Sequence, residues 1–460
     1  MTAREPRGPS RAGSERWIVL VSRSKLIGTA LVTAALVSAC GAGGSTQNGT
    51  AAWTCAPGVT DDGITVGVLY PDSGAVSAQY TGFRSGVEAR LAEQNAAGGV
   101  DGRRITAIWR DDESSPGVNL RAAKDLVAAG AFAILEHTAY SEQSAPWLDQ
   151  QHIPVVGVAD QPLWADHPNM FTYTYVADDT EATTTLGQFV QSRGGTRAAL
   201  IITSATRASL LYAESARRSL EAAGIPVVFE EPIDGITMAN VVGRIVRTGA
   251  DTLVAATSLD IYTGALITAA ERGHPFGTAI SPAGYDMRVL ASGLRQALAG
   301  TYTPLPFTAL ERDLPAHRDY LAAMARHAPE IQPPSQQSAV NGWISADLFL
   351  RGLRTPGHCP TRDSYIHGLR GVTDYDAGGL LIRKVDLSAG SGQLDRCADF
   401  VRVSGTGDVF ETVEPQPRCG ELVPAAPGLT AATTSATGSA TTSATISAPD
   451  GSGRSGHLLT

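Results

Sequence analysis

The residues from Gly98 to Asp112 read GGVDGRRITAIWRDD, and this stretch contains the turn, the strand and the strand end that decide the fold of the chain. Its glycines suit a tight turn with positive φ. The segment 104–109 is predicted to be a strand. Apolar residues recur at helical spacing over 80–95, before the turn, and 117–129 is predicted to be a second helix. The stretch therefore connects one predicted helix to the next predicted strand in an alternation of helices and strands.

This alternation continues on both sides of the quoted stretch. A repeated βα pattern predicts a parallel sheet covered by helices on both faces. A second set of the same kind begins after 170–175, so we expect two similar α/β lobes. Further strands are predicted at 64–70, 132–135, 153–158, 198–202, 227–230 and 252–256, and helices at 141–150, 181–192, 210–223, 239–247, 262–272, 315–327 and 339–353.

A short apolar run, LIGTALVTAALVSAC from Leu26 to Cys40, follows the basic residues Arg23 and Lys25. A basic flank, an apolar core and small residues before the break are typical of a secretory signal. The run is too short to span a bilayer. Cys40 after Val37-Ser38-Ala39 resembles a bacterial lipobox, in which the cysteine is acylated and becomes the N-terminus. The alternative is an ordinary signal peptide that ends near a cysteine.

The composition excludes several classes of protein. The chain has 460 residues, of which 43% are hydrophobic and 18% charged, as in ordinary globular proteins with one large or two medium domains. Its formal net charge is −9, and removal of the basic leader makes it more acidic. An acidic protein repels phosphates, so we expect no nucleic-acid partner.

Four cysteines remain after Cys40: Cys55, Cys359, Cys397 and Cys419. An even number in an exported chain predicts two disulfides. Four cysteines allow three connectivities, and the proximity of domain termini favours Cys55–Cys419 with Cys359–Cys397. No CxxC pair is present, so no zinc or other metal site is expected.

The sequence from 62 to about 413 resembles the leucine/isoleucine/valine-binding family, the type I solute-binding proteins of ABC importers. The GGVDGRR turn, the strand end Asp111-Asp112 and the segment 73–80 after the first strand carry this resemblance. It implies the type I periplasmic binding protein fold, in which two Rossmann-like lobes are joined by a multi-strand hinge. It also implies a monomer that is not an enzyme and has no cofactor.

The expected organisation follows from this resemblance and from the composition. The Ala/Thr/Ser-rich end lacks large apolar residues and is predicted to be disordered. The segments are a signal peptide at 1–39, a lipidated N-terminus and linker at 40–61, lobe 1 at 62–175 and 303–395, lobe 2 at 176–302 and 396–420, and the tail at 421–460.

Two loops of the first lobe match ligand-binding loops of the family. The resemblance implies that Thr138 or Ser141 gives a hydroxyl, and the backbone of Ala139 and Tyr140 gives N–H groups, to a ligand carboxylate. Ser141 alternatively is only a helix N-cap.

The second of these loops, Ala159-Asp160-Gln161, would add backbone and polar contacts. Asp160 and Gln161 depart from the small residues of the family and suggest a more polar ligand. Tyr80 matches an aromatic residue that lines the side-chain pocket, or is a half-exposed aromatic at a helix start.

In the second lobe, Tyr212 matches a family tyrosine that covers the ligand, although an interior helix aromatic would look the same. Asp260 lies one residue before the place where the family has an acidic residue for the ligand ammonium. Asp260 therefore binds that group or only caps the following helix.

The function expected is that of an extracytoplasmic substrate-binding lipoprotein of an ABC importer, held at the cell membrane by its lipid anchor. It would bind a small polar solute, an amino acid or a related amide or acid, between two lobes and present it to a membrane permease. The alternative is a ligand-sensing receptor of the same fold with no transport role. A secreted hydrolase needs a nucleophile motif that the sequence lacks. The run Asp111-Asp112-Glu113 is interpreted as a solvated strand end rather than as acid–base carboxylates.

Overall fold

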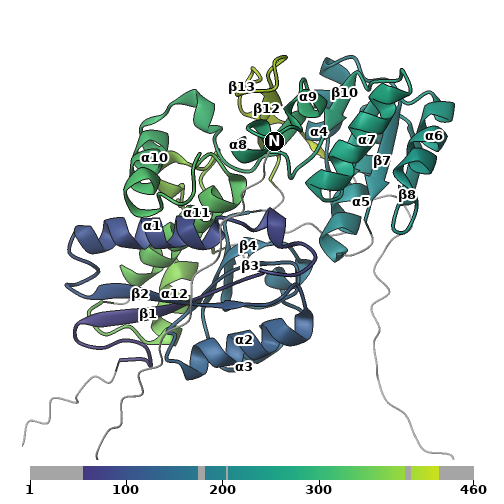
Figure 1. Ribbon diagram of the computed structural model, residues 1–460. Helices are drawn as coiled ribbons and strands as arrows, with labels where there is room; N and C mark the ends of the chain where they lie inside the picture. The colour runs from purple at the N-terminus through teal and green to yellow at the C-terminus, as the bar shows by residue number, and fades with distance from the viewer. Residues whose placement is uncertain (1–54, 175–181, 204–205, 356, 389–394, 424–460) are drawn as a thin grey trace, which may run out of the picture. The chain divides into compact units, whose positions relative to one another are not determined.

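The computed structural model describes residues 55–174, 182–203, 206–355, 357–388 and 395–423. The predicted signal peptide, Cys40 and most of the predicted tail lie outside these ranges. Within them, the strands form two main sheets, each with its own helices, which confirms the predicted two-lobe α/β fold (Figure 1).

The first lobe is built on a five-stranded sheet in which every strand runs parallel to its neighbours. The strand order is β2-β1-β3-β4-β5, so the chain reverses its direction of progress across the sheet between β1 and β3. Every residue of β3 and β4 is buried, as expected for strands covered on both faces. The strands are β1 Gly63–Tyr70, β2 Arg104–Asp111, β3 Ile134–Thr138, β4 Val155–Ala159 and β5 Met170–Thr172.

The two faces of this sheet pack against different helices. Val68 of β1 belongs to the same buried cluster as Phe83 of α1 and Ile344 of α11. Leu69, the next residue, points to the opposite face and joins a cluster with Leu126 of α2. Figure 1 shows α1 and α2 on opposite sides of the sheet. The helices of this lobe are α1 Phe83–Ala96, α2 Pro116–Ala128, α3 Ala145–Gln150, α10 Pro315–His327, α11 Gln337–Leu353 and α12 Arg362–Arg370.

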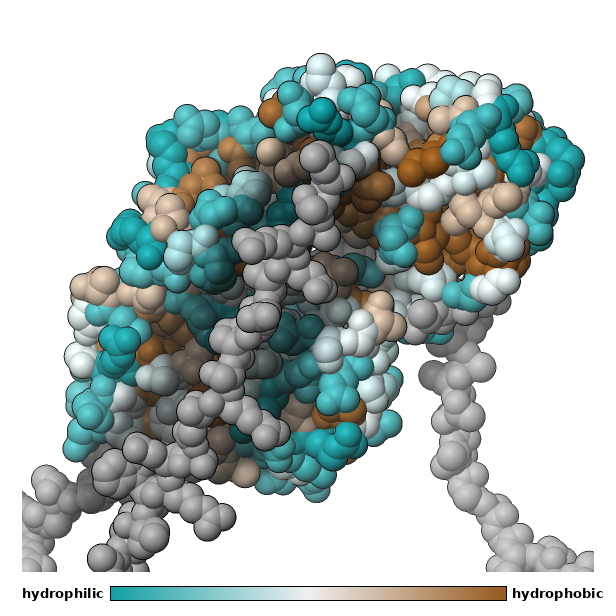
Figure 2. All heavy atoms as spheres, viewed as in Figure 1, coloured by the Kyte–Doolittle hydropathy of each residue, from teal (hydrophilic) through white to brown (hydrophobic). Residues whose placement is uncertain are grey.

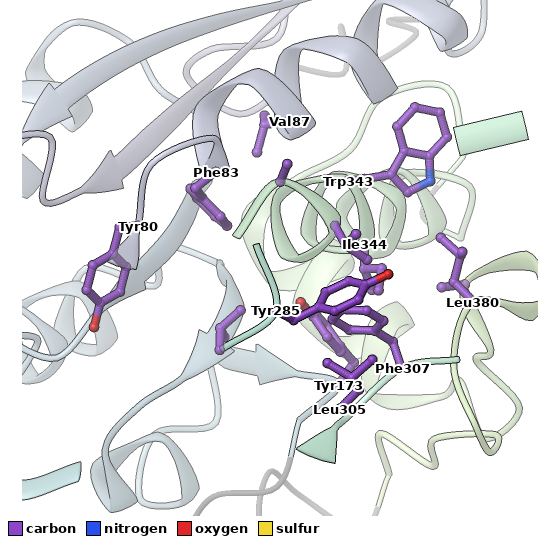
Figure 3. Close-up of a cluster of buried hydrophobic side chains, with 14 of the residues drawn as sticks. Tyr80, Phe83, Val87, Tyr173, Tyr285, Leu305, Phe307, Trp343, Ile344 and Leu380 are labelled. Carbon is purple, nitrogen blue, oxygen red and sulfur yellow. The ribbon is translucent and has the colours of Figure 1, made fainter. Parts of the chain in front are cut away.

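Helices α1 and α11 approach each other closely at two glycines. A Cβ at Gly86 would overlap the carbonyl oxygen of Ala339, and a Cβ at Gly342 would overlap the carbonyl oxygen of Phe83. Only glycine permits this backbone contact. Phe83 and Ile344 lie in one buried cluster beside the crossing (Figure 3). The crossing fixes α1, and with it the loop that carries Tyr80.

The turn quoted at the start of the sequence is a tight hairpin. Gly98 and Gly99 have φ of 98° and 76°, and the N–H of Val100 donates to the carbonyl of Arg103 at 2.9 Å. The Arg103 side chain is buried, and its guanidinium donates to the carbonyl oxygens of Thr60 and His358 at 2.6 Å each. The motif thus ties the start of β1 to the loop before α12.

The second lobe is built on a larger, mixed sheet of order β13-β12-β11-β10-β9-β7-β8. The strands from β7 to β11 are parallel, whereas β12 and β13 are antiparallel. The short strand β14 pairs with β12, and β6 pairs with β15 near the end of the described chain. The strands are β6 Ala182–Thr183, β7 Ala198–Ile202, β8 Val227–Pro232, β9 Thr252–Ala256, β10 Thr278–Ile280, β11 Tyr302–Leu305, β12 Cys397–Val403, β13 Phe410–Thr412, β14 Arg418–Cys419 and β15 Leu422–Val423.

Few large hydrophobic side chains are exposed in the described part of this lobe, and they are spread over helices, turns and the short strand β15: Leu210, Ile236, Ile267, Leu294, Val409 and Leu422. Hydrophobic residues gather around α5 on the face drawn in Figure 2, and Leu210 of α5 is 39% exposed. Single exposed apolar residues of this kind are normal at protein surfaces. The helices are α4 Thr185–Ser192, α5 Arg207–Ala222, α6 Met238–Thr248, α7 Leu259–Glu271, α8 Met287–Leu290 and α9 Arg295–Leu298.

The predicted disulfide pairing is wrong. The structure pairs Cys55 with Cys359 and Cys397 with Cys419. The segment after Cys55 lies beside the one after Cys359, where the N–H of Ala56 donates to the carbonyl of Pro360 at 3.1 Å. Cys397 and Cys419 face each other directly on the antiparallel pair β12 and β14. Local strand pairing, rather than proximity of the termini, decides the second bridge.

Three details differ from the segments expected from the sequence. Strand β11, most of which falls in the range 303–395 assigned to lobe 1, pairs within the second sheet. Strand β15 lies inside the range 421–460 assigned to the tail. Helix α12 is not among the helices expected from the sequence; it is short and begins with a capping box in which the Thr361 hydroxyl accepts from the N–H of Ser364.

Within the described ranges, no helix is both long enough and apolar enough to cross a membrane.

Candidate ligand-binding site

Polar side chains gather where the strands of the first sheet end. Asp112 follows β2, Thr138 ends β3, and Asp160 follows β4. Because the carboxyl ends of parallel strands meet at one edge, and the strand order reverses between β1 and β3, this edge is where an open α/β sheet binds ligands. We call it the first-lobe edge.

Two fully buried carboxyl groups lie under this edge. The side-chain amide of Asn119, from α2, donates to Asp112 Oδ2 at 3.3 Å and to Glu136 Oε1 at 3.2 Å. All three residues are 0% exposed. The interpretation of Asp112 as part of a solvated strand end is therefore wrong, because the turn after β2 folds it inward, where Asn119 and Thr138 bind it.

The hydroxyls predicted to hold a ligand carboxylate are bonded to these protein carboxyls instead. Thr138 Oγ1 donates to Asp112 Oδ2 at 2.5 Å, and Ser141 Oγ donates to Glu136 Oε1 at 3.1 Å. Both residues are buried. Ser141 is not a helix N-cap either, because α3 begins at Ala145.

Two backbone N–H groups of the same loop also have partners inside the protein. The N–H of Ser141 donates to Gln161 Oε1 at 2.9 Å, and Gln161 in turn donates to Glu142 Oε2 at 2.9 Å. The N–H of Tyr140 donates to Thr138 Oγ1 at 3.3 Å. Ala139 is 6% exposed and Ala159 is 7% exposed. Gln161 thus holds the two loops of the first-lobe edge together.

Asp160 presents the accessible carboxyl group of this edge. Its side chain is 23% exposed, and its Oδ2 accepts a hydrogen bond from the Tyr80 hydroxyl at 2.9 Å. His137 Nε2 lies 3.6 Å from the same oxygen. The His137 ring sits between Tyr80 and Phe83, with ring centroids 4.6 Å and 5.2 Å away. Tyr80 is 6% exposed, so it is not the half-exposed aromatic that was the alternative interpretation.

Burial shifts the protonation equilibria of the site. It raises the pKa of Asp160 to about 7 and that of Glu136 from 4.5 to about 7, because the ionised forms lose hydration. Hydrogen bonds from Tyr80 to Asp160, and from Asn119 and Ser141 to Glu136, oppose these shifts. Burial also lowers the pKa of His137 to about 3, so its ring is neutral at pH 7.

The second-lobe residues singled out by sequence lie in different settings. Tyr212 of α5 lines a cavity of about 130 Å³, which Thr185, Phe400 and others also line. Its hydroxyl is buried without a hydrogen-bond partner among the described residues. Asp260 is exposed in the first turn of α7, where a negative charge is favourable, and the N-cap of this helix is Ser258 rather than Asp260.

The geometry describes a binding edge rather than a metal centre. The described residues hold no group of three or more histidine, cysteine, aspartate or glutamate side chains that could bind a metal ion.

The sequence profile described as "Periplasmic binding protein" matches residues 63–408, which span both sheets. The chain belongs to the periplasmic binding protein family. This family comprises extracytoplasmic binding proteins, in agreement with the expectation that the chain is not an enzyme.

Solved structures of periplasmic binding proteins share this fold. The fatty acid ABC transporter substrate-binding protein from Thermomonospora curvata has a TM-score of 0.66 at 18% identity, over 80% of this chain and 95% of that one. The branched-chain amino acid transporter substrate binding protein from Streptococcus pneumoniae, in complex with isoleucine, has a TM-score of 0.65 at 14% identity, over 77% of this chain and 100% of that one. A solute binding protein from R. palustris, in complex with 4-hydroxybenzoate, has a TM-score of 0.64 at 16% identity, over 78% and 98%.

Sequence similarity to curated proteins is confined to a short stretch. A Leu/Ile/Val-binding protein homolog from Brucella abortus is 36% identical over 74 residues, which are 16% of this chain and 20% of that protein. The match therefore spans about a fifth of that relative. The solved structures, at under 20% identity, establish the fold of this binding protein and not its ligand.

Sequence reasoning missed four residues of this binding protein's edge: Asp112 as a buried group, Asn119, Glu136 and His137. A signal for two of them was present, because Glu136 and His137 stand side by side in the strand ILEHT, which is buried at every residue. Two titratable residues in a buried strand require partners or a function.

Proposed function

We propose that this chain is the extracytoplasmic substrate-binding lipoprotein of an ABC importer, and that it binds one small polar solute between its two lobes. The family match over 63–408 carries the proposal, because it spans both lobes and belongs to a family of binding proteins. Importer binding proteins of the same fold, from S. pneumoniae and T. curvata, support the transport role.

The polarity of the first-lobe edge supports a small polar solute. Asp160 and Tyr80 place a carboxyl group and a hydroxyl at the strand ends, next to the backbone of Ala159. Solved binding proteins of this fold hold isoleucine, leucine or 4-hydroxybenzoate, and another belongs to a fatty acid ABC transporter, so the fold accommodates different ligands. The solute is therefore set by side chains at the edge rather than by the fold.

The leader supports attachment to the outer side of the cell membrane. The apolar run 26–40 ends in Val37-Ser38-Ala39-Cys40, and the glycine-rich residues 41–45 follow as a flexible spacer. Acylation of Cys40 would hold the binding lobes close to a membrane permease, which is the partner an importer requires.

A thermal-shift screen of the purified protein against amino acids, amides and small acids tests the binding role. A solute that binds only the folded protein raises the melting temperature, by an amount that grows with its concentration. At 100 times its dissociation constant it adds about 2.7 kcal/mol to the free energy of unfolding. Isothermal titration calorimetry of any hit should give one site per chain. If no small solute shifts the melting temperature, the proposal fails.

A further inference from the structure

The charges at the first-lobe edge are of one sign. Three acidic side chains lie here, Asp112, Glu136 and Asp160. The negative charges of Asp112 and Asp160 both raise the pKa of Glu136, so the groups are close enough to interact electrostatically. Among the residues described, no arginine or lysine forms an ion pair with any of the three, and His137, which faces Asp160, is neutral at pH 7. At pH 8, above the pKa of about 7 of both Asp160 and Glu136, the edge is therefore negative, and no cationic side chain of the described residues pairs with it.

Two buried acceptor atoms at this edge have no hydrogen-bond partner. The hydroxyls of Thr138, Ser141 and Tyr80 all donate to protein carboxyls, and the N–H groups of Tyr140 and Ser141 are bonded as described above. By contrast, Glu136 Oε2 and His137 Nδ1 are buried and have no partner. Glu136 is 0% exposed and His137 is 7% exposed. A buried polar atom without a partner is costly, and a ligand that donates to it removes the cost.

Aromatic rings surround the accessible carboxyl group. Tyr80 and His137 contact each other edge to face beside Asp160, and the half-buried Tyr140 lies close enough to raise the pKa of Tyr80. A carboxylate among aromatic rings matches a protonated amine, which forms an ion pair with the carboxylate and is attracted to the ring faces.

We propose that the first-lobe edge binds the cationic end of the ligand, a protonated amine or a guanidinium group, with Asp160 as its ion-pair partner and the rings of Tyr80 and His137 beside it. This inference rests on the proposed binding function and specifies its ligand class. It reverses the polarity implied by the family resemblance, which assigned the ligand carboxylate to this lobe. Above pH 7 a carboxylate here would meet like charges, and the Thr138, Ser141 and Tyr80 hydroxyls that could donate to it are bonded to protein carboxyls instead.

Ligands that differ only in their end groups test the polarity. Leucine without its carboxylate is 3-methylbutylamine, and leucine without its ammonium group is 4-methylpentanoate. Phenylalanine gives 2-phenylethylamine and 3-phenylpropanoate in the same way. Agmatine adds a guanidinium probe. Thermal shift followed by calorimetry with the purified full chain at pH 8 measures each of them, and the amines should bind while the matched carboxylates do not.

Two variants show whether Asp160 is responsible. Asp160→Asn removes the charge but keeps an acceptor for the Tyr80 hydroxyl, and it should weaken amine binding on the order of ten- to a hundredfold. Asp166→Asn removes an exposed carboxylate from the same loop region and should leave amine binding unchanged. Circular dichroism melting of both variants checks that they are folded.

The outcomes separate this inference from the proposed function. Amine binding that Asp160→Asn weakens at least about tenfold and Asp166→Asn leaves unchanged supports the inference. If 4-methylpentanoate or 3-phenylpropanoate binds and the amines do not, the inference is overturned while the binding function stands. Amine binding that is equal in parent and Asp160→Asn overturns it as well. If neither the screen nor this panel gives any binding, both proposals fail.

Discussion

At the scale of single residues, the burial of Glu136 links stability to pH. The folded protein holds the Glu136 proton more tightly than the unfolded chain does, because burial raises its pKa from 4.5 to about 7. The contribution to stability is therefore fully present below pH 4.5 and is lost as the pH rises to about 7. Ionised Glu136 should then cost the folded state on the order of 3 kcal/mol.

Glu136→Gln should remove this dependence while keeping the side chain's shape. We expect the free energy of unfolding of the variant, relative to the parent, to improve by on the order of 2 kcal/mol between pH 5 and pH 8. Urea unfolding at both pH values measures it. Glu411→Gln, at an exposed position on β13, is the matched control and should show no such change. An equal difference at the two pH values would contradict the prediction.

Residue roles were the least predictable part of the sequence. Thr138 and Ser141 are expected in a strand-to-helix loop, and they lie at the end of β3 and shortly after it. Their hydroxyl partners were not predictable, because Asp112 comes from the turn after a different strand and Glu136 is an acidic residue buried within β3 itself. A spacing in one sequence does not reveal which acceptor a hydroxyl will find.

At the scale of elements, the contact between α1 and α11 should be intolerant of any side chain. Gly342→Ala would place a methyl group against the carbonyl of Phe83, and Gly86→Ala would place one against the carbonyl of Ala339. Overpacking of this kind costs about 1–3 kcal/mol or more. Urea unfolding should show that loss for both variants. Gly293→Ala, where a Cβ would meet nothing within 4 Å, should stay within about 0.5 kcal/mol of the parent; similar losses in all three variants would refute the packing argument.

The disulfides differ in the length of chain that they close. Cys55 and Cys359 are 304 residues apart, whereas Cys397 and Cys419 are 22 apart. A disulfide that closes a longer loop removes more conformational entropy from the unfolded chain and therefore stabilises the folded state more. Removal of the first bridge should lower the free energy of unfolding by up to about 5 kcal/mol, and removal of the second by about 3 kcal/mol. Thermal melting of the two double-serine variants compares these losses.

The pairing itself can be checked by non-reducing peptide mapping. It should recover the peptides Cys55–Cys359 and Cys397–Cys419, and a Cys55–Cys419 peptide would contradict the structure.

Elements were predictable where their periodicity was strong. The strands Ala198–Ile202 and Thr252–Ala256 and the helix Pro315–His327 have the bounds expected from the sequence. The disulfide pairing was not predictable, since it depends on β14, a two-residue strand that is defined only by its pairing with β12. The pattern of apolar residues predicts whether a segment forms a helix or a strand. It does not predict which distant strand that segment pairs with, because the pairing also depends on the sequence of the partner strand.

At the scale of the whole molecule, the sequence after Val423 should be dispensable. It consists mainly of alanine, threonine, serine and glycine, which bury too little apolar surface to fold. Truncation after Val423 should leave the melting temperature unchanged. Truncation after Gly420 is the matched comparison, because it removes β15 and its pairing with β6 and should lower the stability by about 1 kcal/mol. A fall of several degrees with the first truncation would show that the tail contributes to folding.

The proposed membrane attachment through Cys40 is the second prediction at the scale of the whole molecule. The only long apolar run at the start of the sequence ends at this residue and is too short to span a bilayer, so attachment would depend on acyl chains. Cys40→Ser leaves the signal intact but removes the acylated sulfur, and it should move the protein from the membrane fraction to the medium. Ser45→Ala, in the spacer, should remain with the membrane. The two variants should also bind ligand equally well, because the residues at the first-lobe edge lie far along the chain from Cys40. If Cys40→Ser stays in the membrane fraction like Ser45→Ala, another part of the chain provides the anchor.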